Sequence, residues 1–431
     1  MNLADELEVG GAAPLRGHVR VPGDKSISHR ALLFGALAHG RSAITHLASG
    51  ADVHATRLAL EHLGVHIRTK GGTVIVDADG IDAWTEPDRV IDCENSGTMM
   101  RTLLGALAGR PFLAVLTGDA SLRQRPMRRV VDPLRAMGAH IDGRNDGDLA
   151  PLAVRGGRLH GMRHELAVAS AQVKTALLLA GIQADGRTEV VSPGPTRDHT
   201  ERMLSALGVA VQCDGNVVAI ERSALEPLEL DVPGDPSSAA FFAVAAAITP
   251  GSDIVIDDMS CNPTRTGFVE VLRRMGADIE LMPRGEACGE PYGELRVRSS
   301  ALSATTIAGE EIGNVIDEIP ALAIAAAFAD GVTEVRDAAE LAVKESNRIG
   351  TIHQELTQLG AQVETRPDGL VIRGGSPLRA GRLKSHGDHR IAMAAAVAAH
   401  ALDEHSIVRG WRAVASSYPE FAADLEHLTS A

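Results

Sequence analysis

Charged and hydroxyl side chains gather in a segment near the amino end, VPGDKSISHRALLFGALAHG, which runs from Val21 to Gly40. A similar segment, VPGDPSSAAFFAVAAAI, begins at Val232 but has only small and apolar residues where the first has Lys25, His29 and Arg30. Only five of the 42 basic residues are lysine, so a compact ammonium at position 25 suggests a task that a guanidinium does not perform. The chain thus repeats a scaffold and charges one copy, which indicates a chemical role for that copy.

The same kinds of side chain stand in front of other apolar runs. The segments are DKSISHR (24–30), ENSGTMMR (94–101), ASAQVK (169–174), DEIP (317–320) and GDHR (387–390), with further basic residues in LRQRPMRR (122–129), TRDHTER (196–202) and KESNR (344–348). The start of a helix presents unpaired N–H groups and the positive end of its dipole, so it attracts anions. We expect these ends to meet in one cleft between two lobes. Such a cleft suits one or two small ligands with several negative charges, and its cations would stabilise charge that shifts during a reaction.

Two classes of helix alternate along the chain and position these segments. One class is rich in alanine and leucine on nearly all faces, as buried helices are, and its members begin near residues 28, 96, 171, 237, 319 and 389. The other class is amphipathic and ends in Leu/Met-Gly-Ala/Val-x-Ile/Val, where the glycine indicates a helix end and the β-branched residues begin a strand. It occurs at 60–67, 134–141, 204–211, 272–279 and 356–363, with a sixth candidate at 417–428.

Short β-rich runs such as GTVIVDA, FLAVLTG and DIVID lie between the helices, so the chain divides into six units of about 70 residues. We predict an α/β (α+β) fold with three units in each of two lobes. Lobe 1 is expected to be discontinuous, with residues 1–22 and 235–431, and lobe 2 to contain residues 23–234. The Pro-Gly pairs near 21–24 and 231–235 supply turns at which hinges could flex when the lobes close on a ligand.

The composition is that of a globular protein. Of the 431 residues, 45% are hydrophobic and 23% are charged, and the formal net charge of −14 lacks the basic footprint of a nucleic-acid binder. There is no apolar run long enough for a membrane span, and the acidic start MNLADELEVGG lacks the features of a signal or transit peptide. The four cysteines are too sparse for a disulfide framework. We expect a cytoplasmic monomer with no nucleic-acid or membrane partner.

Two motifs resemble ligand sites but lack the remaining residues of those sites. GDKS is part of a phosphate-loop pattern, but the spacing G-x-x-x-x-G-K-[ST] is absent. His386, Asp388 and His389 lie too close along the chain for a tetrahedral metal site, and no fourth ligand is evident. The sequence therefore predicts neither nucleotide nor metal binding, and Arg390 is expected to face a substrate.

Ten ordered motifs extend from about residue 14 to residue 426: PGDKSISHRALL, NSGTMMR, TGDASLRQRPMRRVVDPLRAMGA, SAQVKTALLLAG, TRDHTERML, VPGDPSSAAFF, NPTRTGF, DEIPALA, AAELAVKESNRI and DHRIAMA. Together they resemble the 5-enolpyruvylshikimate-3-phosphate (EPSP) synthase family, most closely its bacterial class II type. The resemblance implies a two-lobed enolpyruvyl transferase fold, an inside-out α/β barrel with three βαβαββ units in each lobe. It implies transfer of the enolpyruvyl group of phosphoenolpyruvate to the 5-hydroxyl of shikimate 3-phosphate by addition and elimination. Phosphate is released, the step belongs to the shikimate pathway towards chorismate, and no metal or organic cofactor is expected.

The resemblance also implies two sets of substrate-binding residues. Those implied for shikimate 3-phosphate are Lys25, Ser26, Arg30, Ser170, Ala171, Gln172, Arg197, Asp317 and Lys344. Those implied for phosphoenolpyruvate are Lys25, Gly97, Arg125, Gln172, Arg348 and Arg390. Guanidinium groups suit phosphoenolpyruvate because they bind two oxygens of a carboxylate or phosphate at once.

Three of the residues implied by the resemblance are candidates for proton transfer. Asp317 is the candidate general base on the 5-hydroxyl, and Glu345 is the candidate for proton exchange at the methylene carbon. Lys25 is the third, since an arginine there would be too basic to release a proton. The division of proton transfers among the three stays open, because their titrations would be coupled.

Two positions bear on the phosphoenolpyruvate site. Many relatives carry a basic residue near the SYPEF motif, where this chain has Ser416 and Ser417, so the remaining arginines must compensate for a missing contact. Gly97 lets a ligand approach the backbone closely, and in this family an alanine at the matching position narrows the space for the herbicide glyphosate. We therefore expect a glyphosate-sensitive enzyme.

Two alternative functions are weighed against this one. UDP-N-acetylglucosamine enolpyruvyl transferases share the fold, but they typically have a cysteine where Ala120 precedes Arg125 and Pro126. A non-catalytic binder of anionic metabolites would need the cations but not the carboxylates, and both Asp317 and Glu345 are present.

Overall fold

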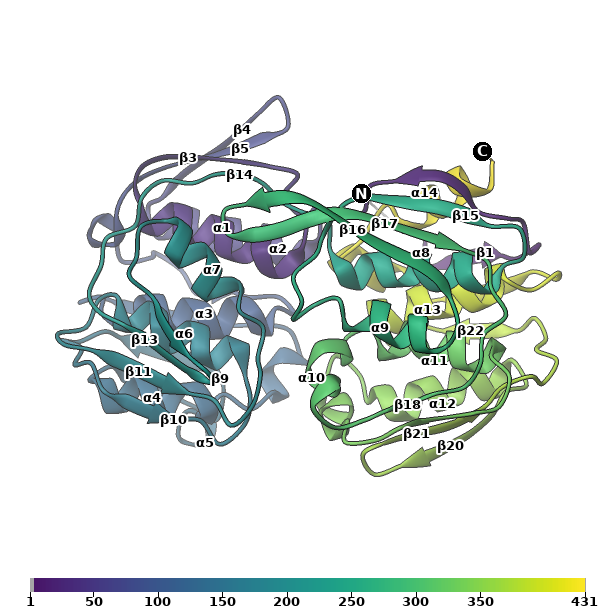
Figure 1. Ribbon diagram of the computed structural model, residues 1–431. Helices are drawn as coiled ribbons and strands as arrows, with labels where there is room; N and C mark the ends of the chain where they lie inside the picture. Colours follow the sequence, from purple (N-terminus) through teal and green to yellow (C-terminus); the bar gives the residue numbers. More distant parts are fainter. Residues whose placement is uncertain (1–3, 431) are drawn as a thin grey trace. The chain divides into compact units, whose positions relative to one another are not determined.

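The computed structural model describes residues 4–430, whose contacts define two compact units (Figure 1). Unit 1 contains the residues up to Pro22, then Pro233–Gly285 and the chain from Pro291 onward; unit 2 contains Gly23–Val232 and Glu286–Glu290. The predicted lobes differ from these units in two places: Glu286–Glu290, predicted for lobe 1, belong to unit 2, and Pro233 and Gly234, predicted for lobe 2, belong to unit 1. Residues 1–3 and 431 of the predicted lobe 1 lie outside the described residues.

Unit 2 repeats one group of elements three times. The first group has α1 (Lys25–Leu37), β3 (His39–Thr45), α2 (Ala51–His62), β4 (His66–Lys70) and β5 (Thr73–Asp79), followed by the turn η1 (Ile81–Ala83). The second has β6 (Ile91–Asp92), α3 (Gly97–Leu107), β7 (Leu113–Thr117), η2 (Leu122–Gln124), α4 (Arg128–Met137), β8 (His140–Gly143), α5 (Arg144–Gly147) and β9 (Leu149–Arg155). The third has β10 (Arg163–Glu165), α6 (Ala171–Gly181), β11 (Thr188–Val191), α7 (His199–Ala206), β12 (Gln212–Asp214), β13 (Val217–Ile220) and then β14 (Glu229–Asp231).

The three sheets of unit 2 share one strand order. The orders are β14-β3-β5-β4, β6-β7-β9-β8 and β10-β11-β13-β12. In each sheet the first pair is parallel and the next two pairs are antiparallel. A parallel pair needs a crossover, which a buried helix supplies in the second and third groups. The first sheet instead takes its outer strand, β14, from the end of the unit, so the unit closes on itself.

Unit 1 follows the same plan with strands from both ends of the chain. Its elements are β1 (Glu6–Val9), β2 (Arg16–Val19), α8 (Pro236–Ile248), β15 (Asp253–Ser260), α9 (Gly267–Arg274), β16 (Asp278–Ala287), β17 (Glu290–Arg298), β18 (Thr306–Ile307), η3 (Gly309–Glu311), α10 (Ile312–Val315), α11 (Ile319–Phe328), β19 (Val332–Val335), η4 (Ala339–Val343), α12 (Arg348–Gln358), β20 (Gln362–Arg366), β21 (Gly369–Arg373), β22 (Arg382–Lys384), α13 (His389–His400), β23 (Ser406–Arg409), η5 (Trp411–Ser416) and α14 (Phe421–Thr429). Its sheets are β16-β17-β15-β2, β18-β19-β21-β20 and β1-β23-β22. The last has three strands rather than the four of the predicted pattern, because α14 follows where two further strands would stand and β1 pairs with β23.

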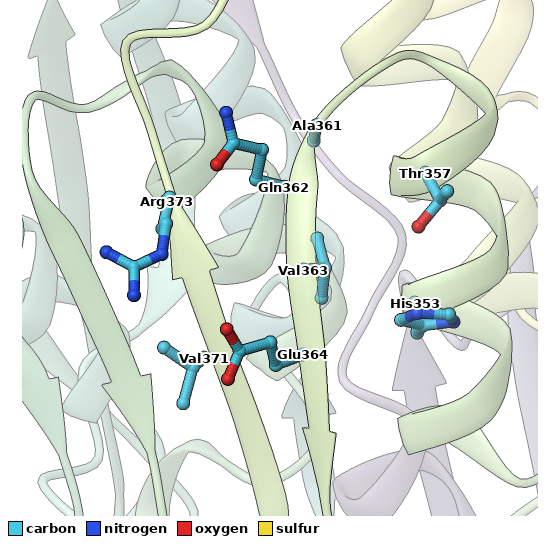
Figure 2. Close-up of a pocket in the computed structure, with 8 residues that line it drawn as sticks. All are labelled: His353, Thr357, Ala361, Gln362, Val363, Glu364, Val371 and Arg373. Carbon is cyan, nitrogen blue, oxygen red and sulfur yellow. The ribbon is translucent and has the colours of Figure 1, made fainter.

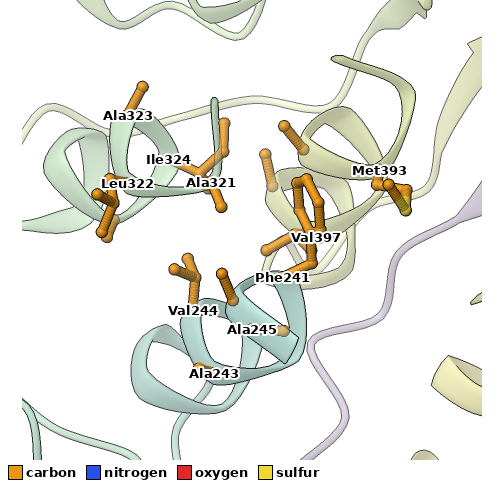
Figure 3. Packing of buried hydrophobic residues seen from close by; sticks show 14 of the residues in the cluster. Phe241, Ala243, Val244, Ala245, Ala321, Leu322, Ala323, Ile324, Met393 and Val397 are labelled. Atoms are coloured by element: carbon orange, nitrogen blue, oxygen red, sulfur yellow. The ribbon is translucent and has the colours of Figure 1, made fainter. Parts of the chain in front are cut away.

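Six nearly apolar helices form the two cores. In unit 1, α8, α11 and α13 pack against one another, with Phe241, Leu322 and Val397 among the side chains between them (Figure 3). In unit 2, α3 packs against both α1 and α6. The six helices start at residues 25, 97, 171, 236, 319 and 389, so the predicted starts are confirmed within a turn. No helix within residues 4–430 is both long and apolar enough to cross a membrane.

Side-chain caps fix where five of these six helices begin. Asp24, Ser96, Ser170, Asp235 and Asp388 each accept a hydrogen bond from a backbone N–H of the first turn. The sixth helix, α11, has Pro320 in its first turn, where the missing N–H needs no partner. A cap of this kind stabilises a helix by about 1 kcal/mol. Because it fixes where the helix begins, the residues that follow the cap lie in the first helical turn. The predicted site residues Lys25, Gly97, Ala171 and Arg390 stand within two positions of such a cap.

The close approach of α3 and α6 depends on a glycine, which gives a prediction about stability. A Cβ at Gly105 would lie 2.6 Å from the Cα of Ala176, so we expect Gly105→Ala to lower the free energy of unfolding by about 1–3 kcal/mol. At Gly350 of α12 the nearest atom would be 3.7 Å away, so Gly350→Ala should change stability by less than about 1 kcal/mol. Urea unfolding of both variants checks this, and equal effects would contradict it.

Candidate active site

Arg30, on α1, is the buried centre of one cluster of predicted site residues in unit 2. Its Nε donates a hydrogen bond to Thr200 Oγ1, and its Nη2 donates one to Thr175 Oγ1, both at 2.8 Å. Its Nη1 donates to the carbonyl oxygen of Ser26 at 2.9 Å. Thr175 lies on α6 and Thr200 on α7, so three helices hold a guanidinium whose residue is only 3% exposed.

The groups that accept hydrogen bonds from Arg30 are neutral, so they do not neutralise the charge of its guanidinium. Burial lowers the pKa of Arg30 to about 10, although the charges of Glu201, Asp24 and Glu290 oppose the shift. The charge of Arg197 lowers the same pKa, so this second predicted phosphate-binding residue acts electrostatically on Arg30. Arg30 is still cationic at neutral pH, and within residues 4–430 no carboxylate contacts it directly. An anion bound here would meet a charge that is not already neutralised.

Lys25 opens α1, and its Nζ lies 3.0 Å from Asp52 Oδ2 in the first turn of α2. The side chain of Lys25 is 20% exposed and that of Asp52 is 9% exposed, so solvent or a ligand can reach this ion pair. Asp52 was missed by the sequence analysis because no pattern ties the start of α2 to that of α1. Lys174, in contrast, forms a buried ion pair with Glu201, which is a structural contact between α6 and α7.

Gln172 and Gly97 meet around Arg101, another residue without a role in the sequence analysis. Gln172 Oε1 accepts a hydrogen bond from Arg101 Nη1 at 2.6 Å, and its Nε2 donates to Thr98 Oγ1 at 2.9 Å. A Cβ on Gly97 would lie 2.8 Å from Arg101 Nη1 and 3.4 Å from Arg125 Nη1. Glycine at position 97 therefore lets two guanidinium groups approach the start of α3.

Of the remaining predicted residues of unit 2, Ser170 and Ala171 lie at the start of α6, and Arg125 follows η2. Ser170 Oγ accepts a hydrogen bond from Val173 N at 3.4 Å as the cap of α6, and Ala171 is the first residue of that helix. Arg125 Nη2 donates to Asn95 Oδ1 at 2.7 Å, in the turn that precedes α3. Unit 2 thus contributes residues from α1, α3, α6 with its cap, the end of η2 and the segment before α7: Lys25, Ser26, Arg30, Gly97, Ser170, Ala171, Gln172, Arg125 and Arg197.

Ser28 and His29 belong to the charged segment of α1 but have structural contacts. Ser28 Oγ accepts a hydrogen bond from Ala48 N at 3.0 Å, and His29 Nδ1 lies 2.7 Å from Thr56 Oγ1. Burial, followed by the charges of Lys25 and Arg30, lowers the pKa of His29 to about 3. The imidazole is therefore neutral at pH 7, and it adds no charge beside Lys25.

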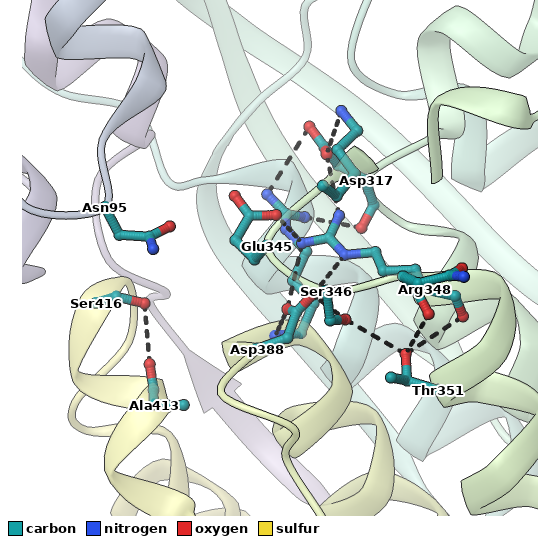
Figure 4. Close-up of polar contacts among 12 residues, drawn as sticks. Asn95, Asp317, Glu345, Ser346, Arg348, Thr351, Asp388, Ala413 and Ser416 are labelled. Atoms are coloured by element: carbon teal, nitrogen blue, oxygen red, sulfur yellow. Dashed lines mark hydrogen bonds and ion pairs between the residues drawn. The ribbon is translucent and has the colours of Figure 1, made fainter. Parts of the chain in front are cut away.

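Arg348, at the start of α12, is the centre of a cluster in unit 1, and its side chain is completely buried (Figure 4). Its Nε lies 2.8 Å from Asp388 Oδ2, and its Nη2 lies 3.2 Å from Asp388 Oδ1 and 2.6 Å from Glu345 Oε2. Its Nη1 donates to Asp317 Oδ1 at 3.4 Å. Burial alone would lower the pKa of Arg348, but the charges of Asp388, Glu345 and Asp317 outweigh it and raise that pKa. Burial likewise acts to raise the pKa of Asp388, and the charge of Arg348 prevails and lowers it.

Asp317 joins the other predicted residues of unit 1 to this cluster. Its Oδ1 accepts from Lys344 Nζ at 3.5 Å, and its carbonyl oxygen accepts from Arg390 Nη1 at 2.8 Å. The predicted residues Asp317, Lys344, Glu345, Arg348 and Arg390 are therefore all within one network of contacts. Asp388, which the sequence analysis considered only as a metal ligand, is the residue that anchors the network to α13.

The two serines near SYPEF supply no charge to this network. Ser416 Oγ donates a hydrogen bond to the carbonyl oxygen of Ala413 at 2.9 Å, within η5 (Figure 4). The oxygen of Ser417 is buried and has no hydrogen-bond partner within residues 4–430. The two positions at which the sequence analysis expected a missing basic contact thus hold uncharged side chains.

A surface hollow elsewhere in unit 1 contains none of the predicted site residues. It has a volume of about 250 Å³ and lies where His353 and Thr357 of α12 face Val363 of β20 (Figure 2). Gln362, Glu364 and Arg373 complete its polar lining. Across the described part of the chain, no group of three His, Cys, Asp or Glu side chains is arranged to hold a metal ion.

Comparisons with known proteins identify the family of the chain. The chain matches the family described as "EPSP synthase (3-phosphoshikimate 1-carboxyvinyltransferase)" over residues 9–425. It is 53% identical over 424 residues to the 3-phosphoshikimate 1-carboxyvinyltransferase of Desulforudis audaxviator, covering 98% of this chain and 99% of that protein. The protein of the same name from a Synechococcus species is 51% identical over 431 residues, which cover 99% of this chain and 97% of that one.

Solved structures show the same likeness. The EPSP synthase of Acinetobacter baumannii has a TM-score of 0.88 at 41% identity, with 98% of each chain covered. The enolpyruvyl transferase NikO of Streptomyces tendae, at 20% identity and a TM-score of 0.80, shares the fold. The predicted enolpyruvyl transferase fold is therefore confirmed.

The neutral His29 gives a prediction about pH. Its pKa of about 3 in the folded chain lies below the unfolded value of 6.5, so the unfolded chain binds more protons between these pH values. Above about pH 6.5 the neutral His29 makes its full contribution to the free energy of unfolding. This contribution falls by about 1.4 kcal/mol per pH unit as the pH decreases towards 3. We expect His29→Gln to lack this slope when unfolding free energies are compared at about pH 6 and about pH 4.5. His66→Gln, at an exposed histidine of β4, is the control, and parallel curves for His29→Gln and the unsubstituted protein would refute the prediction.

Proposed function

The chain belongs to the EPSP synthase family, and we propose that its two clusters of buried cations and carboxylates act on one pair of substrates. The enzyme transfers the enolpyruvyl group of phosphoenolpyruvate to the 5-hydroxyl of shikimate 3-phosphate and releases phosphate, in the shikimate pathway. Neither a UDP-N-acetylglucosamine enolpyruvyl transferase nor a non-catalytic binder is favoured by relatives of this identity and coverage.

The cluster around Arg30 is proposed to bind shikimate 3-phosphate. The observation that supports it is the set of neutral acceptors, which leaves the charge of Arg30 available to a phosphate. Arg197 adds a second cation, and the starts of α1 and α6 add N-terminal helix ends that attract anions. Lys25, Ser26, Ser170, Ala171 and Gln172 line these ends and are proposed to contact the same substrate, with Lys344 and Asp317 from unit 1.

Phosphoenolpyruvate is proposed to bind Arg125 and Arg390, with Lys25, Gly97, Gln172 and Arg348 as the further contacts. Within residues 4–430 Arg390 makes one side-chain hydrogen bond, to the Asp317 carbonyl oxygen, so most of its N–H groups can serve a carboxylate or phosphate. Arg348 differs, because each of its guanidinium nitrogens already meets a carboxylate. Direct binding to Arg348 therefore requires that Glu345 or Asp317 move aside as the substrate enters.

Proton transfer is proposed to use Asp317, Glu345 and Lys25. In the addition, Asp317 accepts the proton of the 5-hydroxyl while the hydroxyl oxygen attacks the carbon that bears the phosphate, and Glu345 or Lys25 in its protonated form donates a proton to the methylene carbon. In the elimination, the group that donated this proton takes one back from the same carbon, and phosphate leaves with the electron pair of its C–O bond. The observation that carries this assignment is that Arg348 holds the carboxylates of Asp317 and Glu345 on one guanidinium, at 3.4 and 2.6 Å. Groups that act in succession on one small substrate need such proximity.

The remaining expectations are proposals of the same kind. We propose that the two units are the two lobes of the fold and that the enzyme works as a monomer without a metal or organic cofactor. A cytoplasmic location is supported by Cys93, Cys213, Cys261 and Cys288, which are all free thiols. Burial raises the pKa of Cys93, Cys261 and Cys288, so these thiols are largely protonated at neutral pH.

The substrate assignment is tested by phosphate release from phosphoenolpyruvate. We expect release with shikimate 3-phosphate as the acceptor and none with UDP-N-acetylglucosamine. Release with the second acceptor alone would overturn the assignment, and release with neither would indicate a binder.

The role of Asp317 gives a prediction for a single variant. Asp317→Asn keeps the shape of the side chain but removes the base, so we expect kcat to fall by about 10²–10⁴-fold. Binding of shikimate 3-phosphate, measured by calorimetry, should change far less. The matched control is Asp330→Asn, at an exposed aspartate two residues after the end of α11. A variant of Asp317 that retains most of its kcat would remove this residue from the mechanism.

Gly97 gives a prediction about inhibition by glyphosate. The Cβ of Gly97→Ala would lie 2.8 Å from Arg101 Nη1, so either the guanidinium moves or the space at the start of α3 shrinks. We expect the unsubstituted enzyme to be glyphosate-sensitive and Gly97→Ala to need about tenfold or more glyphosate for half-inhibition. Activity assays across a glyphosate series check this, and an unchanged inhibition curve for the variant would contradict it.

A further inference from the structure

A second group of buried charges lies beside Arg390 in unit 1 and is not used by the mechanism above. Asp235 is 7% exposed, Ser237 3%, Arg265 1% and Glu318 0%. They come from VPGDPSS, NPTRTGF and DEIP, motifs that carry the family resemblance, but none of these four residues received a role in the sequence analysis. Burying charges is costly unless they are paired, so this group needs an explanation.

The four side chains form one chain of contacts that leads towards Arg390. Arg265 Nη2 donates hydrogen bonds to Asp235 Oδ1 at 2.9 Å and to Ser237 Oγ at 3.0 Å. The Ser237 hydroxyl in turn donates to Glu318 Oε1. That same oxygen lies 3.9 Å from Arg390 Nη1. These contacts connect Arg265, in the turn before α9, to Arg390, whose guanidinium is proposed to bind phosphoenolpyruvate.

The distance between Glu318 and Arg390 is informative in itself. At 3.9 Å the carboxylate attracts the guanidinium but lies beyond hydrogen-bond distance. Asp317 Oδ2 stands at the same 3.9 Å from Arg390 Nη2, and the only side-chain hydrogen bond of Arg390 within residues 4–430 goes to the Asp317 carbonyl oxygen. Two carboxylates thus hold Arg390 by charge without occupying its N–H donors. Arg348 is the opposite case, since carboxylates occupy all three of its nitrogens.

Side chains of opposite charge stand next to one another in this group. Two cations, Arg265 and Arg390, stand with two carboxylates, Asp235 and Glu318. Asp235 also accepts from the N–H of Ser237 at 2.8 Å as the cap of α8, so the polar end of this group is fixed to the helix. The Ser237 hydroxyl is both an acceptor from Arg265 and a donor to Glu318, so it sets the position of the Glu318 carboxylate.

We propose that Glu318 is a positioning residue that orients Arg390 for phosphoenolpyruvate, and that Ser237 and Arg265 aim the Glu318 carboxylate. The inference rests on the proposed role of Arg390 in binding that substrate. It assigns a task to the second VPGD copy: its Asp235 and Ser237 support a substrate-binding cation, where the first copy supplies such cations directly. Glu318 touches neither substrate in this proposal, so its effect should appear in binding of one substrate.

The test begins with Glu318→Gln, which keeps the shape and removes the charge. We expect the KM for phosphoenolpyruvate to rise by about tenfold, with kcat and the KM for shikimate 3-phosphate changed by less than about threefold. Ser237→Ala should raise the same KM by about threefold or more, because it removes the hydroxyl that aims the carboxylate. Ser238→Ala, at the equally buried neighbour outside the chain of contacts, should leave all three constants unchanged.

A double-mutant cycle shows whether Glu318 acts through Arg390. If it does, adding Glu318→Gln to Arg390→Lys should change the KM for phosphoenolpyruvate by less than about twofold beyond Arg390→Lys alone. Independent effects that multiply would overturn the proposal, as would an unchanged KM in folded Glu318→Gln. If Glu318→Gln does not fold, Ser237→Ala against Ser238→Ala decides, and equal constants for these two would overturn it. An unchanged KM in Arg390→Lys would instead remove Arg390 from the binding site, and the proposal would fall with that premise.

Discussion

Burying the Arg348 guanidinium at the start of a helix is costly, and the carboxylates of the unit 1 cluster offset that cost. Arg348 stands at the start of α12, where the positive end of the helix dipole opposes a cation. An unpaired charge in that place would cost several kcal/mol. Asp388 removes much of this cost by contacting the guanidinium through both oxygens, and it also caps α13. The contact that stabilises the cation thus also fixes where the next buried helix begins, beside Arg390.

Each of the two clusters buries a guanidinium, but the groups that surround it differ. This difference fits the proposed roles of the clusters. Burial lowers the pKa of Arg30 to about 10, and its partners are hydroxyl and carbonyl oxygens, so its charge is left without a direct counterion. Arg348 is surrounded by carboxylates, so its pKa rises. A site that binds a phosphate needs the first arrangement, because the ligand itself supplies the negative charge. A site that moves protons needs the second, because its carboxylates must be held in place.

The sequence predicted what depends on local pattern and missed what depends on packing between repeats. The buried helices could be located because alanine-rich runs follow capping residues, and these runs place Lys25 and Arg390 at helix starts. The partners of these residues could not be located: Asp52 reaches Lys25 from another helix, and Thr200 reaches Arg30 from another repeat. His29 looked like part of the charged set, yet only its burial shows that its ring is neutral. The three-stranded sheet was missed because β1 joins it from the opposite end of the chain.

The two VPGD copies show how far a shared scaffold determines function. In both copies an aspartate caps a buried helix. Asp24 Oδ1 accepts a hydrogen bond from Ile27 N, and Asp235 Oδ1 accepts one from Ser237 N, each at 2.8 Å. The cap therefore belongs to the fold, and the chemistry lies in the first helical turn after it. In one copy that turn begins with Lys25, which remains partly exposed; in the other it contains Ser237, which is buried against Arg265 and Glu318. An exposed cation can meet a ligand directly, whereas a buried hydroxyl can act only through its neighbours. The absence of charge in the second copy is thus consistent with a supporting role for the same helical turn.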